Sequence, residues 1–164
     1  MEVTRERAWR TLTTYTTSES LLRHALAVEA SVRSYARRFG EDEEAWGCAA
    51  LLHDFDYEIH PSLDEHPQDG APILRREGYP EWLVEAVLSH AEHLAMPRDT
   101  PLKRTLFACD ELSGFVHACG LVRPDGGVDY LVRRYRDRLA LPWHGHPARN
   151  RRADNELLHV CSLR

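Results

Sequence analysis

The sequence predicts an all-α protein that folds as a single domain over residues 1–164. Along most of the chain, apolar residues recur at steps of three and four, which is the spacing of one helix face. Glycines and prolines fall between these runs, and no segment alternates apolar and polar residues as a strand would. With 164 residues, of which 43% are hydrophobic, the chain can bury a core of its own but is short for two domains.

The first two predicted helices have clear boundaries. A short helix covers about residues 4–14. The second begins at Ser18, a residue type that often caps helix N-termini, and its apolar stripe continues until Gly40 ends it.

The third predicted helix covers residues 42–54, DEEAWGCAALLHD. It begins with acids, which suit a helix N-terminus, and then becomes almost wholly apolar. We therefore expect it to run into the middle of the protein and to end there in His53 and Asp54. Residues 55–65 have no apolar period and contain a proline, so we expect a loop directly after this pair.

The rest of the chain predicts further helices and a tail of different character. Helices are expected at about 66–77 and 80–93, and a long one runs from Pro101 to about Val122. Residues 128–140 can form another helix. The segment 140–164 is rich in arginine, which indicates either a solvated face or frayed end, or a binding surface.

Charge and hydropathy argue against nucleic-acid binding and against a membrane-spanning segment. Lys and Arg number 21 against 26 Asp and Glu, so the net charge of -5 provides no general basic field for nucleic acid. No apolar run is long enough to span a bilayer, and the N-terminus does not resemble a signal peptide.

The four cysteines form no Cys-x-x-Cys pair and are expected to be reduced core residues. We expect a soluble cytoplasmic protein with a small-molecule substrate, and a homo-oligomer remains open.

Histidines and acids at buried positions are the candidate ligands. His24 lies at helical spacing with apolar residues, a position that is more often taken by a hydrogen-bonded core histidine than by a ligand. His53 and Asp54 carry more information, because burying an ionised carboxylate is costly unless a positive group such as a metal ion pairs with it. His66, His90 and Asp110 recur on later predicted helices with apolar neighbours.

Together these six residues form a nitrogen and oxygen ligand set without thiolates. Such ligands suit Fe, Mn, Co, Ni or Zn in catalytic sites. Six ligands are too many for one ion that keeps an open position, whereas two ions bridged by Asp54 would use them all. The alternative is a set of unrelated helix histidines.

The ordered series His24, His53-Asp54 and Asp110 resembles the HD superfamily of metal-dependent phosphohydrolases, over residues 19–123. His66 in HPQDGAPIL and His90 in SHAEH resemble the two additional histidines of its two-metal branch. The segment ACDELSGF resembles small bacterial HD proteins that are described as predicted hydrolases. The resemblance implies an HD-domain helical bundle with the metal site in its core.

The resemblance also implies how the ligands divide. One metal would be held by His24, His53, Asp54 and Asp110, and a second by Asp54, His66 and His90. A water or hydroxide between one or two divalent ions (Fe, Mn, Co, Ni, Zn or Mg) would hydrolyse a phosphate ester or anhydride. We expect a small phosphorylated metabolite or nucleotide as substrate.

Three further residues are candidates for roles around these ligands. Lys103 lies two turns before Asp110 and is a candidate general acid, or else an ordinary solvated residue at a helix start. His93, one turn after His90, is a candidate substrate-binding residue. Tyr57 is another, in the same loop as His60 and Asp64.

Two other functions remain open at this point. Some two-metal HD proteins resemble this ligand set yet hold two irons and cleave C-C or C-P bonds with dioxygen. A metal-stabilised binding domain without activity is disfavoured, because no ligand of the series is missing. The tail at 140–164 departs from the pattern of similar small HD proteins, so no substrate contact is inferred there.

Overall fold

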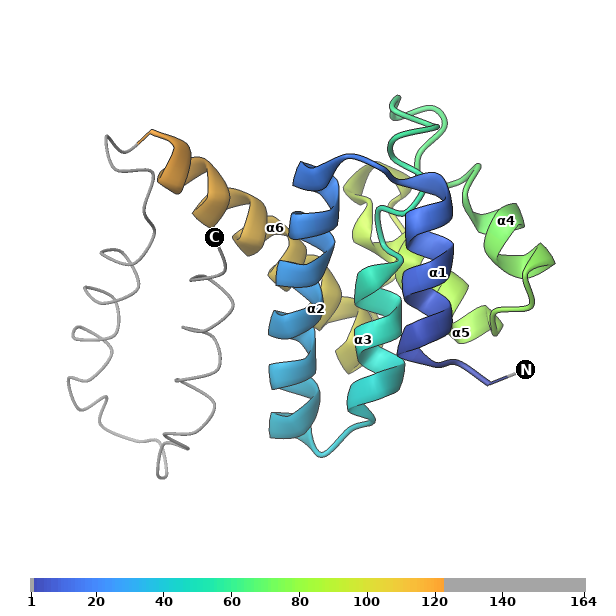
Figure 1. The fold of residues 1–164 in the computed structure, drawn as a ribbon. Coiled ribbons are helices and arrows are strands. Elements are labelled where there is room, and N and C mark those ends of the chain that lie inside the picture. The colour runs from blue at the N-terminus through green and yellow to red at the C-terminus, as the bar shows by residue number, and fades with distance from the viewer. Residues whose placement is uncertain (1, 123–164) are drawn as a thin grey trace. The chain divides into compact units, whose positions relative to one another are not determined.

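A computed structural model describes residues 2–122, and every regular element in that range is a helix (Figure 1). The all-α prediction is therefore confirmed for this part of the chain. The predicted helix at 128–140 and the tail at 140–164 lie outside the described residues. The elements are, in order, α1 (Arg5–Tyr15), α2 (Glu19–Phe39), α3 (Glu43–Leu51), α4 (Ala71–Arg76), α5 (Glu81–His90), the short 3-10 helix η1 (Glu92–Leu94) and α6 (Pro101–Leu121).

Helix α3 forms the centre of the packing. It contacts α1, α2 and α5, and its residues from Trp46 to Leu51 are all buried. In Figure 1, α1 and α2 stand beside it. A helix that is apolar on every side is stable only when other elements cover every side, so the composition of α3 explains its central place.

Local interactions set where the first helices begin and end. Asp42 caps α3 by accepting from the amides of Glu44 and Ala45, and Gly40 ends α2 with a left-handed φ of 73°. Ser18 precedes α2 as predicted, but its side chain makes no cap hydrogen bond. Instead, Glu58 accepts from the amide of Ser18 at 2.9 Å, which ties the start of α2 to the segment after α3.

Helices α3 and α4 are shorter than predicted, and both differences concern candidate ligands. Helix α3 ends at Leu51, so His53 and Asp54 lie in a series of turns that continues to residue 70. The helix predicted at 66–77 is confined to α4, and His66 lies in the turns before it. Pro67 disfavours helical geometry at His66, which gives the physical reason for the later start.

The end of α3 has a cause in the side chain of His53. The Nδ1 atom of His53 donates to the carbonyl of Ala50 at 2.7 Å and so satisfies a carbonyl left open by the helix end. The same arrangement recurs at the end of α5, where Nδ1 of His90 donates to the carbonyl of Val87. The helix predicted at 80–93 accordingly ends at His90, and η1 follows.

The chain divides after Ser113 into two units, and all six candidate ligands belong to the first, Met1–Ser113. None of the described helices is both long enough and apolar enough to cross a membrane.

Candidate metal centre

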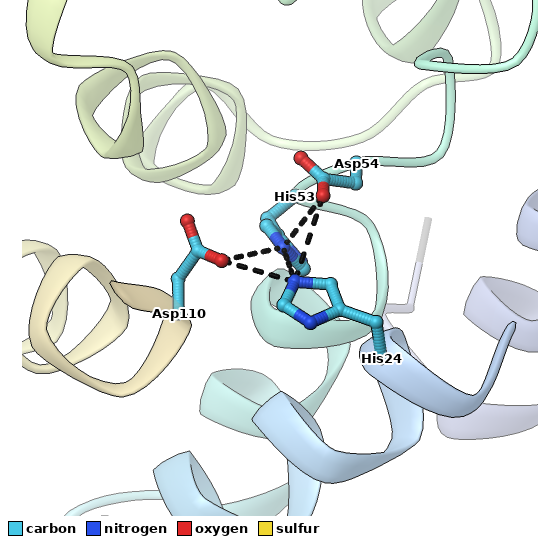
Figure 2. Close-up of side chains that lie close together, drawn as sticks. All are labelled: His24, His53, Asp54 and Asp110. Carbon is cyan, nitrogen blue, oxygen red and sulfur yellow. Dashed lines mark hydrogen bonds and ion pairs between the residues drawn. The ribbon is translucent and has the colours of Figure 1, made fainter. Parts of the chain in front are cut away.

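A first group of ligand atoms comes from three helical regions (Figure 2). His24 lies in α2, Asp110 in α6, and His53 and Asp54 follow α3. The Nε2 atoms of His24 and His53 are 3.1 Å apart. Oδ1 of Asp110 lies 3.0 Å from Nε2 of His24. Oδ2 of Asp54 lies 3.2 Å from Nε2 of His53. Four donor atoms thus converge on one point.

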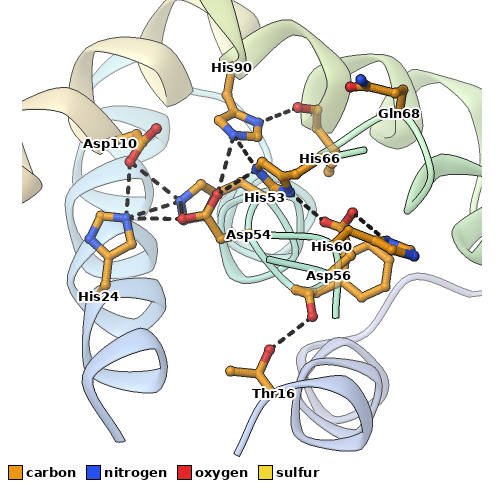
Figure 3. Close-up of polar contacts among 12 residues, drawn as sticks. Thr16, His24, His53, Asp54, Asp56, His60, His66, Gln68, His90 and Asp110 are labelled. Atoms are coloured by element: carbon orange, nitrogen blue, oxygen red, sulfur yellow. Dashed lines mark hydrogen bonds and ion pairs between the residues drawn. The ribbon is translucent and has the colours of Figure 1, made fainter. Parts of the chain in front are cut away.

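A second group uses the other oxygen of Asp54 (Figure 3). Oδ1 of Asp54 lies 3.2 Å from Nε2 of His66 and 3.3 Å from Nε2 of His90. The two Nε2 atoms are themselves 3.3 Å apart. Because Oδ2 faces the first group and Oδ1 faces the second, the Asp54 carboxylate is placed to bridge two ions.

The nitrogen and oxygen atoms of both groups are arranged as metal ligands and not as hydrogen-bond partners of one another. Within each neutral ring, Nδ1 of His53, His66 and His90 donates a hydrogen bond, so Nε2 carries a lone pair. Lone pairs that face each other repel unless a proton or a cation lies between them. Ligand atoms about 2.1 Å from one ion lie roughly 3.0 to 3.4 Å apart, which is close to the spacing in both groups.

Electrostatics within the cluster favour positive charge. Burial opposes charge on His53, but the carboxylates of Asp54 and Asp110 outweigh it and raise its pKa well above the usual value. Burial lowers the pKa of His66, but the hydrogen bonds and charges of Asp54 and Asp56 outweigh this effect and raise the pKa to about 9. The neighbouring imidazoles hold the pKa of Asp54 well below its usual range despite burial. The pKa of Asp110 is also lowered, since His24 and His53 outweigh its burial.

The two groups differ in exposure. The side chains of His24, Asp54 and Asp110 are 21%, 20% and 19% exposed, whereas those of His66 and His90 are 6% and 7% exposed. His53 of the first group is 0% exposed, so solvent reaches His24 and Asp110 more easily than it reaches His53, His66 or His90.

Lys103 does not share the contacts of the cluster. Its Nζ donates to Glu85 at 3.0 Å and to Asp99 at 3.1 Å. The hydrogen bond to Glu85 is the main cause that raises the pKa of Lys103, which makes the ammonium a weaker acid. Its role as general acid stays a prediction, and the observed contacts do not support it.

Tyr57 contacts a histidine of the second group, whereas the contact of His93 is to Gln68, two residues after His66. The ring of Tyr57 meets that of His66 edge-on, with centroids 5.2 Å apart, and Tyr57 is 43% exposed. Nε2 of the exposed His93 lies 3.5 Å from Oε1 of Gln68. Substrate binding by these two residues stays a prediction.

Sequence reasoning missed Asp56. Its side chain is fully buried, and Oδ1 accepts a hydrogen bond of 2.9 Å from Nδ1 of His66 (Figure 3). The available signal was an acid between two aromatic residues, Phe55 and Tyr57, directly after His53-Asp54. A buried acid needs a buried partner, and the prediction of a loop at 55–65 does not identify that partner.

Comparison with known families gives one match. A family model described as HD domain matches residues 21–114, a span that contains all six candidate ligands. Searches of curated proteins and of solved structures found no match.

Proposed function

The chain belongs to the HD-domain family, and from that membership and its ligand geometry we propose that it is a two-metal hydrolase of phosphate esters or anhydrides. HD domains are typically metal-dependent phosphohydrolases. The observation that carries the two-metal proposal is the position of Asp54, whose two oxygens each lie within 3.3 Å of histidine nitrogens of a different group.

Each ligand has a defined part in this proposal. His24, His53 and Asp110 would hold one ion, His66 and His90 the other, and Asp54 both. Two bound divalent ions would supply the positive charge that acidifies a water and stabilises the phosphoryl oxygens. The hydrogen bonds from Nδ1 of His53 and His90 to backbone carbonyls fix the ring orientations before any ion binds. The chain thus provides a preorganised set of ligands, which is what electrostatic catalysis requires.

The charge of the ligand set supports an anionic substrate. With ions bound, its two carboxylates, Asp54 and Asp110, would be negatively charged and its imidazoles, as metal ligands, neutral. Two divalent ions carry four positive charges, so the loaded site would keep an excess of two. A phosphate monoester dianion has the complementary charge. The partly exposed His24 and Asp110 give such a substrate an approach, and we propose a small phosphorylated metabolite or nucleotide.

The proposal is tested on protein purified without chelator and without an affinity metal. Elemental analysis gives the ions per chain, and release of inorganic phosphate is then measured over phosphorylated sugars and nucleotides. We expect two ions per chain and phosphate release that Asp54→Asn abolishes, while Asp64→Asn, an exposed acid in the same segment, retains it. Two coupled irons with substrate-dependent dioxygen uptake and no phosphate release would replace hydrolysis by the oxygenase function.

A further inference from the structure

We propose that Asp56 is a positioning residue for the second ion: it holds the ring of His66, and Gly70 leaves the space that its carboxylate occupies. This inference rests on the proposed two-metal site and concerns a residue outside both ligand groups.

The contact of Asp56 selects one form of His66. Because Oδ1 of Asp56 accepts from Nδ1 of His66 at 2.9 Å, the proton of the neutral ring is kept on Nδ1. Nε2 then presents its lone pair toward Asp54 and His90, at 3.2 Å and 3.3 Å. Without Asp56 the ring could take the other tautomer, with a proton on Nε2 where the ion must bind. A carboxylate behind a ligand histidine also increases its basicity.

The need for a carboxylate at this place follows from the local backbone. His53 and His90 lie at or just after helix ends and use the carbonyl three residues earlier, from Ala50 and Val87. His66 lies in turns rather than at a helix end. Its Nδ1 atom is instead satisfied by a side chain ten residues earlier in the sequence.

The environment of Asp56 is built around its charge. The side chain is 0% exposed, and its second oxygen, Oδ2, lies 3.3 Å from Nδ1 of His60. Burying an ionised carboxylate is costly, and here two imidazoles offset that cost. His60 is 22% exposed, so it closes the cluster on the solvent side.

Gly70 provides an independent observation. A Cβ atom at this position would lie 2.4 Å from Oδ2 of Asp56 and 2.5 Å from its Cγ. The backbone φ of Gly70 is -72°, which any residue adopts, so the close approach of Asp56 is what requires glycine. The change Gly70→Ala therefore displaces the carboxylate without altering its chemistry.

The test is a Mn²⁺ titration of the metal-stripped full chain by calorimetry. Wild type is expected to bind two ions, and the loss of one step in His24→Ala and of the other in His66→Ala assigns them. Asp56→Asn should weaken the second step about 10- to 100-fold and leave the first within about twofold. Gly70→Ala should act in the same direction, and His60→Ala should weaken the second step less, since His66 keeps its bond to Asp56. Asp64→Asn is the matched control and should change neither step.

Several outcomes would overturn the inference. Equal weakening of both steps, with a lowered melting temperature, would make Asp56 a general structural residue. Unchanged affinities in Asp56→Asn would show that the negative charge of Asp56 is not needed to position His66, and this would overturn the role proposed for the carboxylate. If Asp56→Asn does not fold, Gly70→Ala decides by the same criterion. Fewer than two ions in wild type would overturn the proposed two-metal site as well, whereas two ions with a normal Asp56→Asn would overturn the positioning role alone.

Discussion

The two ligand groups share Asp54 but are built in different ways. Helices α2 and α6 carry His24 and Asp110 of the first group, and His53 follows α3 closely. In the second group, His66 lies in the turns at 52–70, and its ring depends on Asp56. His24 and Asp110 of the first group are partly exposed, whereas His53 and both histidines of the second group are buried. We infer that helix packing fixes the first ion position, while the second depends on the end of α5 for His90 and on the side chain of Asp56 for His66.

The largest expected effect comes from the residue that the groups share. Asp54→Asn removes the charge that faces both positions, so we expect neither ion to bind tightly and phosphate release to fall on the order of 10³-fold or more. Elemental analysis and a phosphate assay at saturating Mn²⁺ measure the two effects. Retention of two ions in this variant would mean that Asp54 is not a bridge.

Removing one unshared ligand should separate the groups. His24→Ala is expected to lose the ion of the first group, and His90→Ala that of the second, each leaving about one ion per chain. Both variants should lose most phosphate release, since the proposed reaction uses two ions. Metal content and circular dichroism are measured together, so that a loss of fold is recognised. If either variant loses both ions while folded, the groups form one inseparable site.

Removing the metal ions should lower the melting temperature of the protein, and the free energy involved should be smaller than that of the losses of activity expected above. A ligand that binds only the native state stabilises it by about 2.7 kcal/mol when present at 100 times its dissociation constant. We therefore expect a chelator to lower the melting temperature of wild type by several degrees for a domain of this size. The decrease should be smaller in His66→Ala, which has one ion to lose. An unchanged melting temperature in wild type would indicate that no ion is bound under those conditions.

The smallest expected effect concerns Cys109, the residue beside the ligand Asp110 of the first group. Cys109 precedes Asp110 in α6 and is 4% exposed; burial, aided by the charge of Asp110, raises its pKa to about 11. At pH 8 the thiolate fraction is small, so Cys109 should resist alkylation in the native protein and react after unfolding. Mass spectrometry of the alkylated peptides gives the result. Rapid native modification would show that this part of α6 opens readily, so that helix packing would not fix the position of Asp110.

The sequence was most informative where polar residues interrupt apolar patterns. His24, His53, Asp54 and Asp110 were found because each lies among core residues, and the structure brings all of them together. The helix ends were less predictable, since His53 and His90 themselves end helices through bonds that periodicity does not describe.

Side-chain partners were the least predictable feature. Spacing places Lys103 on the same face as Asp110, yet its long side chain pairs with Glu85 and Asp99 instead. Asp56 was missed for the related reason that a contact ten residues apart within a loop leaves no period in the sequence. Such contacts depend on how turns fold back, which local preferences do not determine.

The bonds from His53 to Ala50 and from His90 to Val87 also limit how this chain can change in length. Each residue of a helix turns the chain by about 100°, because one turn takes about 3.6 residues. A single insertion or deletion inside α3 or α5 would therefore change the direction of His53, just after α3, or of His90, at the end of α5, relative to the residues on the other side of the change. We therefore expect homologues that share the proposed two-metal site to vary in length between these helices and not within them.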